Sequence, residues 1–340
     1  MARGRGLYLR ITEPDNLRLA FKKAVRGKSD RCEVIEFRKN LDDNLARMRT
    51  ELLSGDIRTG SYRFFTVRDP KERIICAAPF RDRVLHHAVM NICEPELESY
   101  SVHDSYACRP GKGLHLALKR AQHFSRKSDW YLKLDIRKYF DSIHHDTMLT
   151  LLSQRFLDER LMELFRRMTI SYQTSPGRGI PIGNLISQHF ANFYLGALDH
   201  WLLEEKKTAG YIRYMDDFIV FAQDRKNLKA RLAEIEKFLA EQLRLTLKDN
   251  RQLNRCSAGI PFLGFRIFPH ITLLAPRSRS RFASKLEHCE QEYIENKIQE
   301  RELARRVSSL VSFTSAADAA GFRRSILSRQ GVPSERALTA

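Results

Sequence analysis

The chain has 340 residues, which as a prior corresponds to about two domains of ordinary size. Its hydrophobic residues, 43% of the sequence, supply a real core and argue against a disordered chain, and no apolar run is long enough to span a bilayer. The 59 lysines and arginines outnumber the 41 acids, and the net charge of +18 points to a polyanionic partner such as nucleic acid, although an inert basic surface has the same composition.

The six cysteines stand far apart and form no C-x-x-C pair, which argues against a structural zinc site and against a disulfide scaffold. Reduced thiols in a cytosol are the simplest interpretation. The basic N-terminus is followed by no apolar stretch, so we expect no secretory signal and a cytoplasmic protein.

The first 31 residues hold nine lysines and arginines against three acids, a composition that fits either a nucleic-acid-contacting arm or a solvated helix. Beyond them, apolar periodicity and turn residues define four elements. These are a helix over 42–53 that ends before Gly55, strands over 62–67 and 73–77 joined by Asp69-Pro70, and a helix over 82–92.

The middle of the chain mixes strands and helices without a strict alternation, which favours an α+β fold over a doubly wound parallel sheet. The predicted elements are strands over 130–135, 212–214, 218–222 and 262–268, and helices over 148–152, 158–168, 190–201 and 228–243. From about Thr272 the sequence becomes charge-mixed with helical character, which predicts a small second domain.

Three acids occupy unfavourable positions: Asp135 ends an apolar strand, and Asp216 and Asp217 lie between two apolar strands. Buried carboxylates are costly unless they are paired or bind a cation. A cluster of such hard oxygen ligands suits Mg²⁺, and two ions roughly 3.5–4 Å apart can catalyse phosphoryl displacement. A hairpin turn with solvated aspartates is the alternative interpretation, since Asp is common in turns.

Six blocks in a fixed order resemble the fingers and palm motifs of reverse transcriptases, over about residues 60 to 270. The blocks are Arg73–Ile75 with Phe80–Val84, Ser105–Gly113, Leu134–Ile143, Gly179–Gln188, Tyr214–Asp217 and Phe262–Phe265. The fourth block narrows the resemblance. Most reverse transcriptases carry Gln-Gly-x-x-x-Ser-Pro there, whereas Ile182-Gly183-x-x-x-Ser187-Gln188 is similar to the enzymes of diversity-generating retroelements.

The resemblance implies a right-hand polymerase of the α+β class. Residues 1–130 would form the basic N-terminal segment and the fingers. Residues 131–271 would form a palm with an antiparallel sheet and a finger-like helical insertion at about 147–178, and residues 272–340 a small helical thumb. The implied activity is RNA-directed DNA synthesis that copies a template-repeat RNA into cDNA with adenine-biased misincorporation, for targeted gene diversification. Two alternatives stay open: a faithful reverse transcriptase of group II intron-like or defence type, and a non-catalytic RNA-binding scaffold.

The same resemblance implies the partners. They are template RNA, a DNA or RNA primer, dNTPs and a small basic accessory variability protein that is oligomeric, in a bacterial, archaeal or phage-encoded system without a membrane. Asp135 and Asp216 would bridge two Mg²⁺ ions, Asp217 would support them, and the Ile136 carbonyl would be a further ligand. Phe140 would exclude a 2′-hydroxyl, although a lone aromatic is more often a core residue.

The nucleotide-binding residues follow from the matched motifs. Lys71 and Arg73 would hold the triphosphate, since guanidinium groups match phosphate geometry, although Lys71 fits a solvated hairpin equally well. Ile182 and Gly183 would lie against the nascent base pair. Because Ile182 cannot hydrogen-bond, discrimination there would depend on shape alone, and we hypothesise that it promotes misincorporation. Ordinary apolar packing at the start of a helix is the alternative.

The remaining implied contacts are less specific. Gln188 replaces the usual proline near the nucleotide, and Arg251 would clamp a phosphate because a guanidinium group is a poor proton donor. Arg109 and Lys112 in a glycine-rich loop would face the template or the nucleotide. The segment Phe262-Leu263-Gly264 would be the primer grip, with Gly264 allowing close backbone approach.

Overall fold

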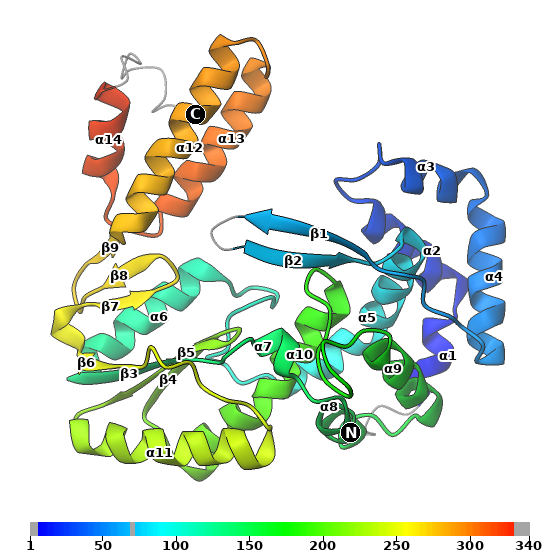
Figure 1. The fold of residues 1–340 in the computed structure, drawn as a ribbon, viewed down its shortest axis with the longest axis horizontal. Helices are drawn as coiled ribbons and strands as arrows, with labels where there is room; N and C mark the ends of the chain where they lie inside the picture. The colour runs from blue at the N-terminus through cyan, green and yellow to red at the C-terminus, as the bar shows by residue number, and fades with distance from the viewer. Residues whose placement is uncertain (1–5, 69–71, 330–340) are drawn as a thin grey trace. The chain divides into compact units, whose positions relative to one another are not determined.

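The computed structural model describes residues 6–68 and 72–329 and has a mixed helix-and-sheet architecture, which confirms the α+β prediction (Figure 1). The chain divides into two compact units, each assembled from three separate stretches. The first unit contains Met1–Cys108, Asp135–Lys206 and Ala233–Asp249, and the second contains Arg109–Leu134, Lys207–Leu232 and Asn250–Ala340. Within the described ranges, no helix is both long and apolar enough to cross a membrane.

The basic opening segment is helical and contributes to the core of the first unit. Its helices are α1 (Leu7–Ile11), α2 (Pro14–Val25), α3 (Cys32–Lys39) and α4 (Leu41–Ser54). Pro14 begins α2, where a missing N–H costs nothing, and Gly55 ends α4 in the left-handed conformation, as the sequence predicts. The apolar face of α2, with Leu17 and Phe21, is buried, and α2 packs against the long helix α5 (Phe80–Tyr100).

The two predicted β-rich runs form the antiparallel hairpin of β1 (Arg63–Arg68) and β2 (Glu72–Ala77), which projects from the helices of this unit (Figure 1). Every residue of β1 is exposed, including Phe64 and Phe65, which have aromatic rings. Lys71 and the Asp69-Pro70 turn lie outside the described residues.

The rest of the first unit is mainly helical. Its elements are α7 (Tyr139–Ser142), α8 (His145–Ser153), α9 (Glu159–Ile170), α10 (Leu185–His200) and the π-helical turn η1 (Trp201–Glu205). Asp158 caps α9 by accepting a hydrogen bond from the Leu161 N–H at 3.2 Å. The predicted stripe of α10 is confirmed at Phe190 and Tyr194, which are buried.

The second unit contains a four-stranded sheet in the order β4-β5-β3-β6. Its strands are β3 (Trp130–Asp135), β4 (Gly210–Tyr214), β5 (Asp217–Ala222) and β6 (Gln252–Arg255). Helix α6 (Leu114–Lys127), which we did not predict, packs on this sheet, where the rings of Phe124 and Phe221 are 5.4 Å apart. Helix α11 (Arg225–Gln242) follows β5 and matches the amphipathic helix predicted there; its residues from Ala233 onward belong to the first unit.

The prediction of one strand over 262–268 is wrong. The segment is a hairpin of β7 (Ile260–Phe262) and β8 (Phe265–Ile267), because Leu263 and Gly264 have φ of 50° and 89° and form a two-residue turn. The C-terminal region also begins with a strand, β9 (Thr272–Leu274), rather than with helix. Helices α12 (Pro276–Ile294), α13 (Glu300–Thr314) and α14 (Ala320–Arg329) follow, and α12 packs against α13.

Candidate active site

Asp216 lies in the two-residue turn between β4 and β5. Tyr214 pairs with Asp217 across the hairpin, so the turn consists of Met215 and Asp216. Met215 has φ of 57°, which two-residue hairpin turns of the primed types require and which costs energy for a residue with a side chain. The fully buried Arg213 donates from Nη1 to the Met215 carbonyl at 3.0 Å. A tight turn at these acids is therefore confirmed, and Arg213 holds it.

Asp217 begins β5 and forms an ion pair with a lysine of the neighbouring strand β3. Its Oδ1 lies 2.9 Å from Lys133 Nζ, and the two side chains are only 20% and 15% exposed. Lys133 is two residues before Asp135, so their side chains point to the same face of β3. Asp217 thus contacts a lysine whose side chain shares a face of β3 with that of Asp135.

Asp135 ends β3 and accepts a hydrogen bond of 2.6 Å from Lys248 Nζ. The backbone reinforces this contact, because the Lys248 N–H donates to the Asp135 carbonyl at 2.8 Å and the Arg137 N–H donates to the Thr246 carbonyl at 2.9 Å. These two bonds flank the bridge between Ile136 and Leu247 and do not use the Ile136 carbonyl, which stays a candidate ligand.

The donor chemistry of these acids fits a hard divalent cation, because ionised carboxylates and a carbonyl offer only oxygen acceptors. The arrangement is not a ready-made metal cage. Within residues 6–68 and 72–329, no three His, Cys, Asp or Glu side chains are grouped so that they could hold a metal ion. Lysine ammonium groups contact Asp135 and Asp217 instead.

Phe140 lies in the short helix α7 and is half-buried, whereas its neighbour Tyr139 is buried and donates from its hydroxyl to the Ala191 carbonyl at 2.5 Å. Tyr139 is therefore a core aromatic residue of α7, while Phe140 stays a candidate for the predicted contact with the sugar. The Phe140 carbonyl accepts a hydrogen bond from the Ile180 N–H at 2.9 Å, which ties α7 to the loop before α10.

Ile182 and Gly183 contact the β1–β2 hairpin. The Ile182 carbonyl accepts a hydrogen bond from the Cys76 N–H at 2.8 Å. Gly183 has φ of 110°, and a Cβ there would lie 2.7 Å from Ile75 Cγ2. Gln188 is half-buried in the first turns of α10, and Arg73 is exposed on β2.

A cleft of about 330 Å³ lies beside these residues in the first unit. Its lining includes Ile75, Gly183 and Asn184. Four basic side chains, those of Lys28, Arg31, Arg63 and Arg83, outnumber the one acidic side chain, Glu33, which pairs with Arg83. The positive charge and apolar floor are suited to a nucleic-acid strand or nucleotide.

The other predicted contact residues belong to the second unit. Arg109 and Lys112 lie in the loop before α6, and exposed Arg251 lies directly before β6. Phe262 is buried. Two hydrogen bonds stabilise the Leu263-Gly264 turn: the Gly264 carbonyl accepts one from Ser278 Oγ at 2.7 Å and one from the Ala275 N–H at 3.0 Å.

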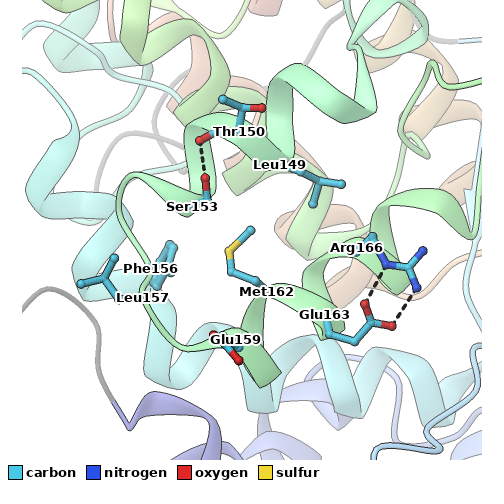
Figure 2. Close-up of a pocket in the computed structure, with 9 residues that line it drawn as sticks. All are labelled: Leu149, Thr150, Ser153, Phe156, Leu157, Glu159, Met162, Glu163 and Arg166. Atoms are coloured by element: carbon cyan, nitrogen blue, oxygen red, sulfur yellow. Dashed lines mark hydrogen bonds and ion pairs between the residues drawn. The ribbon is translucent and has the colours of Figure 1, made fainter.

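A second cleft, of about 560 Å³, lies between α8 and α9 and is lined by none of the predicted site residues. Figure 2 shows Leu149, Phe156 and Met162 around it, with the hydroxyl of Ser153 already donated to the Thr150 carbonyl. Glu163 is likewise engaged with Arg166, which holds the pKa of its carboxyl down at about 2.

Sequence reasoning missed Lys133, Lys248 and Arg213. Lys133 had a usable signal, because a lysine two residues before a strand-terminal acid shares its face. Lys248 is 113 residues from Asp135, so only the fold reveals that pair.

Comparison with known proteins agrees with these motifs. Residues 68–267, more than half of the chain, match the family model described as reverse transcriptase (RNA-dependent DNA polymerase). Protein YkfC of Escherichia coli (strain K12) is 24% identical over 324 residues, which cover 80% of this chain and 83% of that protein. The group II intron-encoded protein LtrA of Lactococcus lactis subsp. cremoris is 24% identical over 214 residues, 59% of this chain and 35% of LtrA.

A solved structure shares the fold. The apo telomerase from Candida tropicalis superposes with a TM-score of 0.54 at 11% identity, covering 80% of this chain and 59% of that one. The chain thus spans most of YkfC but about a third of LtrA. On the family match, the chain belongs to the reverse transcriptase (RNA-dependent DNA polymerase) family and is by class an RNA-directed DNA polymerase.

Proposed function

We propose that this reverse transcriptase copies an RNA template into cDNA with errors concentrated at template adenines, as in diversity-generating retroelements. The observation that carries the finer assignment is Ile182. It stands where most of the family has glutamine, half-buried and adjacent to the basic cleft. A hydrocarbon side chain cannot test a base pair by hydrogen bonding, and a site that relies on shape rejects misfits weakly.

In this proposal Asp135, Asp216 and Asp217 form one catalytic group, with the Ile136 carbonyl as a further ligand. The adjacency of β3 and β5 in the sheet and the common face of Lys133 and Asp135 support it. Bound Mg²⁺ would supply activation of the primer 3′-hydroxyl and stabilisation of the leaving oxygen. Arg213 fixes the turn that carries Asp216, and Lys133 and Lys248 hold the other two carboxylates in place.

The nucleotide would be held by first-unit residues. Arg73 is assigned to the triphosphate and Phe140 to the sugar, while Lys71 keeps its assignment from the motif alone. Gln188 and Arg251 would complete the nucleotide contacts. We assign the template and primer contacts to Arg109, Lys112 and the segment Phe262-Leu263-Gly264. The fingers, palm and thumb keep the boundaries that the resemblance implies.

The proposed partners are template RNA, primer, dNTPs and a small basic accessory protein. The net charge of +18 supports nucleic acid as the main partner. Attraction of these charges to the phosphate backbone is weakened by salt and does not depend on the nucleotide sequence.

The test is primer extension on an adenine-rich RNA template, with substitutions in the cDNA counted by sequencing. Asp216→Asn should lower extension by about 10³-fold or more, the scale expected for loss of a group that stabilises transition-state charge. Ile182→Gln should lower errors opposite adenine while keeping extension.

Each failure has a separate meaning. Equal extension by the Asp216→Asn variant and the unaltered protein would contradict the role of the acids and favour an RNA-binding scaffold. Extension with errors spread evenly over all template bases would favour a faithful reverse transcriptase of the group II intron-like or defence type.

A further inference from the structure

The β1–β2 hairpin presents two different faces within the first unit. Phe64 and Cys76 are cross-strand partners on one face, and Phe65 and Ile75 are partners on the other. Phe65 and Ile75 line the basic cleft. Arg73 lies on the same face as Ile75, because the two residues are two apart on β2. An isolated two-stranded hairpin is marginally stable, so contacts with other elements must hold its position.

The cleft face of the hairpin rests on the segment that precedes α10. The Cys76 N–H donates to the Ile182 carbonyl at 2.8 Å. Ile75 approaches Gly183 so closely that a Cβ there would lie 2.7 Å from Ile75 Cγ2. These contacts place β2, and with it Arg73, relative to Ile182.

Tyr172 packs against the other face of the hairpin, opposite to the cleft. Its ring packs edge-on against Tyr62 with centroids 5.9 Å apart and lies 6.4 Å from the ring of Phe64. Its hydroxyl group faces the Cys76 thiol, and burial raises the pKa of both groups, so both are protonated at neutral pH. Tyr62 adds a hydroxyl contact of 3.0 Å to Ser171 Oγ.

The loop between Tyr172 and Ile182 also holds α7. Thr174 Oγ1 donates to the Asp141 carbonyl at 2.9 Å, and the Ile180 N–H donates to the Phe140 carbonyl at 2.9 Å. The connection between α9 and α10 therefore contacts the hairpin twice, through Tyr172 near its start and through Ile182 and Gly183 near its end. Between these contacts it is hydrogen-bonded to α7.

We propose that Tyr172 is a positioning residue for nucleotide selection, an inference that rests on the proposed polymerase function. By packing against Phe64 and Cys76, it fixes the hairpin against Ile182. It thereby sets the position of Arg73 relative to Phe140 and to Ile182, the residue proposed to contact the base pair. Tyr172 itself touches no substrate. Loosening the clamp moves the triphosphate contact without touching the acids, so it alters nucleotide binding and selection more than the chemical step.

The test compares Tyr172→Phe, which keeps the ring and removes the hydroxyl group, with Tyr172→Ala, which removes both. Tyr172→Ala should raise KM for dNTP about tenfold with kcat within about threefold, and should change the ratio of correct to incorrect insertion. Tyr172→Phe should lie between the alanine variant and the unaltered protein. Tyr293→Ala, a half-exposed tyrosine of α12, is the matched control and should change neither quantity.

A second measurement does not depend on activity. Hydrogen–deuterium exchange of segment 62–77 should become faster in Tyr172→Ala than in the Tyr293→Ala control, with exchange of α5 unchanged. Unchanged exchange of that segment, or equal losses in kcat and kcat/KM with an unaltered error spectrum, would overturn the clamp. An unaltered protein without any polymerase activity would instead contradict the proposed function, and the exchange result would still decide on the clamp.

Discussion

Lys248 donates a hydrogen bond of 2.6 Å to Asp135 across 113 residues of sequence, and the backbones of the same two residues are also hydrogen-bonded at 2.8 Å. The side chains are 33% and 22% exposed, so the ion pair is partly screened by water. Its larger consequence is electrostatic: an ammonium group next to a carboxylate opposes a second cation at the same oxygens.

Replacing Lys248 by Met should therefore tighten the binding of a divalent cation. We expect Mn²⁺, followed by the electron paramagnetic resonance signal of the free ion, to bind about fivefold to tenfold more tightly, as loss of one nearby positive charge implies. Lys229→Met on exposed α11 is the control and should leave the affinity unchanged. Equal affinities in the Lys248→Met variant and the unaltered protein would show that Lys248 does not compete at this carboxylate.

Gly183→Ala should be strongly destabilising. The substitution adds a Cβ that meets Ile75 at 2.7 Å and places a side chain at φ of 110°, so we expect a loss of about 2–4 kcal/mol in the free energy of unfolding. Gly177→Ala is the matched control, because its φ is 69° but no atom lies within 4 Å of the added Cβ. Gly177→Ala should lower the free energy of unfolding by only about 1–2 kcal/mol, the penalty for a residue with a side chain in the left-handed conformation. Urea unfolding measures both, and equal losses would contradict the contact.

The buried His86 should make stability fall in mild acid. Burial, followed by the charges of His87 and Arg83, lowers its pKa from 6.5 to about 4. Between these values the unfolded chain binds the proton and the folded chain does not, so stability rises with pH and is lost as pH falls below 6.5. At pH 5 the expected cost relative to pH 7 is about 2 kcal/mol for this residue.

The measurement is urea unfolding of the unaltered protein and of His86→Leu at pH 7 and pH 5. Burial also lowers the pKa of His87 to about 4, so part of the acid sensitivity should persist in the variant. An identical pH dependence in both proteins would mean that His86 does not titrate in this range.

Phe140→Ala should relax discrimination against ribonucleotides. Removing a half-buried ring from α7 leaves room for a 2′-hydroxyl, and we expect the ratio of rNTP to dNTP incorporation to rise by about tenfold or more. Single-nucleotide insertion with matched dNTP and rNTP measures the ratio. Tyr139→Phe, which removes the core hydroxyl of the neighbouring ring, should leave it unaltered, and a rise in both variants would indicate a loosened α7 instead of a steric gate.

Local patterns predicted the elements whose own residues decide their structure. The helix at Leu41–Ser54, the strand at Trp130–Asp135 and the hairpin around Met215-Asp216 have clear periodicity or an apolar strand on each side. The turn at Leu263-Gly264 was missed, because an apolar residue at φ of 50° has no local signal and the Ser278 and Ala275 bonds that hold it come from α12 and the residue before it.

Local sequence likewise predicted some residues of the candidate site and missed others. The three acids follow from the motifs, and the turn that holds Asp216 follows from the flanking strands. Of their lysine partners, Lys133 could have been predicted, because it lies two residues before Asp135 on one strand. Lys248 could not, because no local pattern distinguishes a surface lysine from one that pairs with a distant carboxylate.

The open β1–β2 hairpin has a consequence for how the molecule behaves in solution. Its outer strand exposes Phe64, Phe65 and Val67 along a row of backbone groups, the kind of edge that recruits a strand from another molecule. Mutual repulsion between chains of charge +18 opposes such contacts at low ionic strength. Added salt weakens that repulsion and strips away nucleic acid at the same time, so the conditions that yield the cleanest preparations are also those that favour self-association.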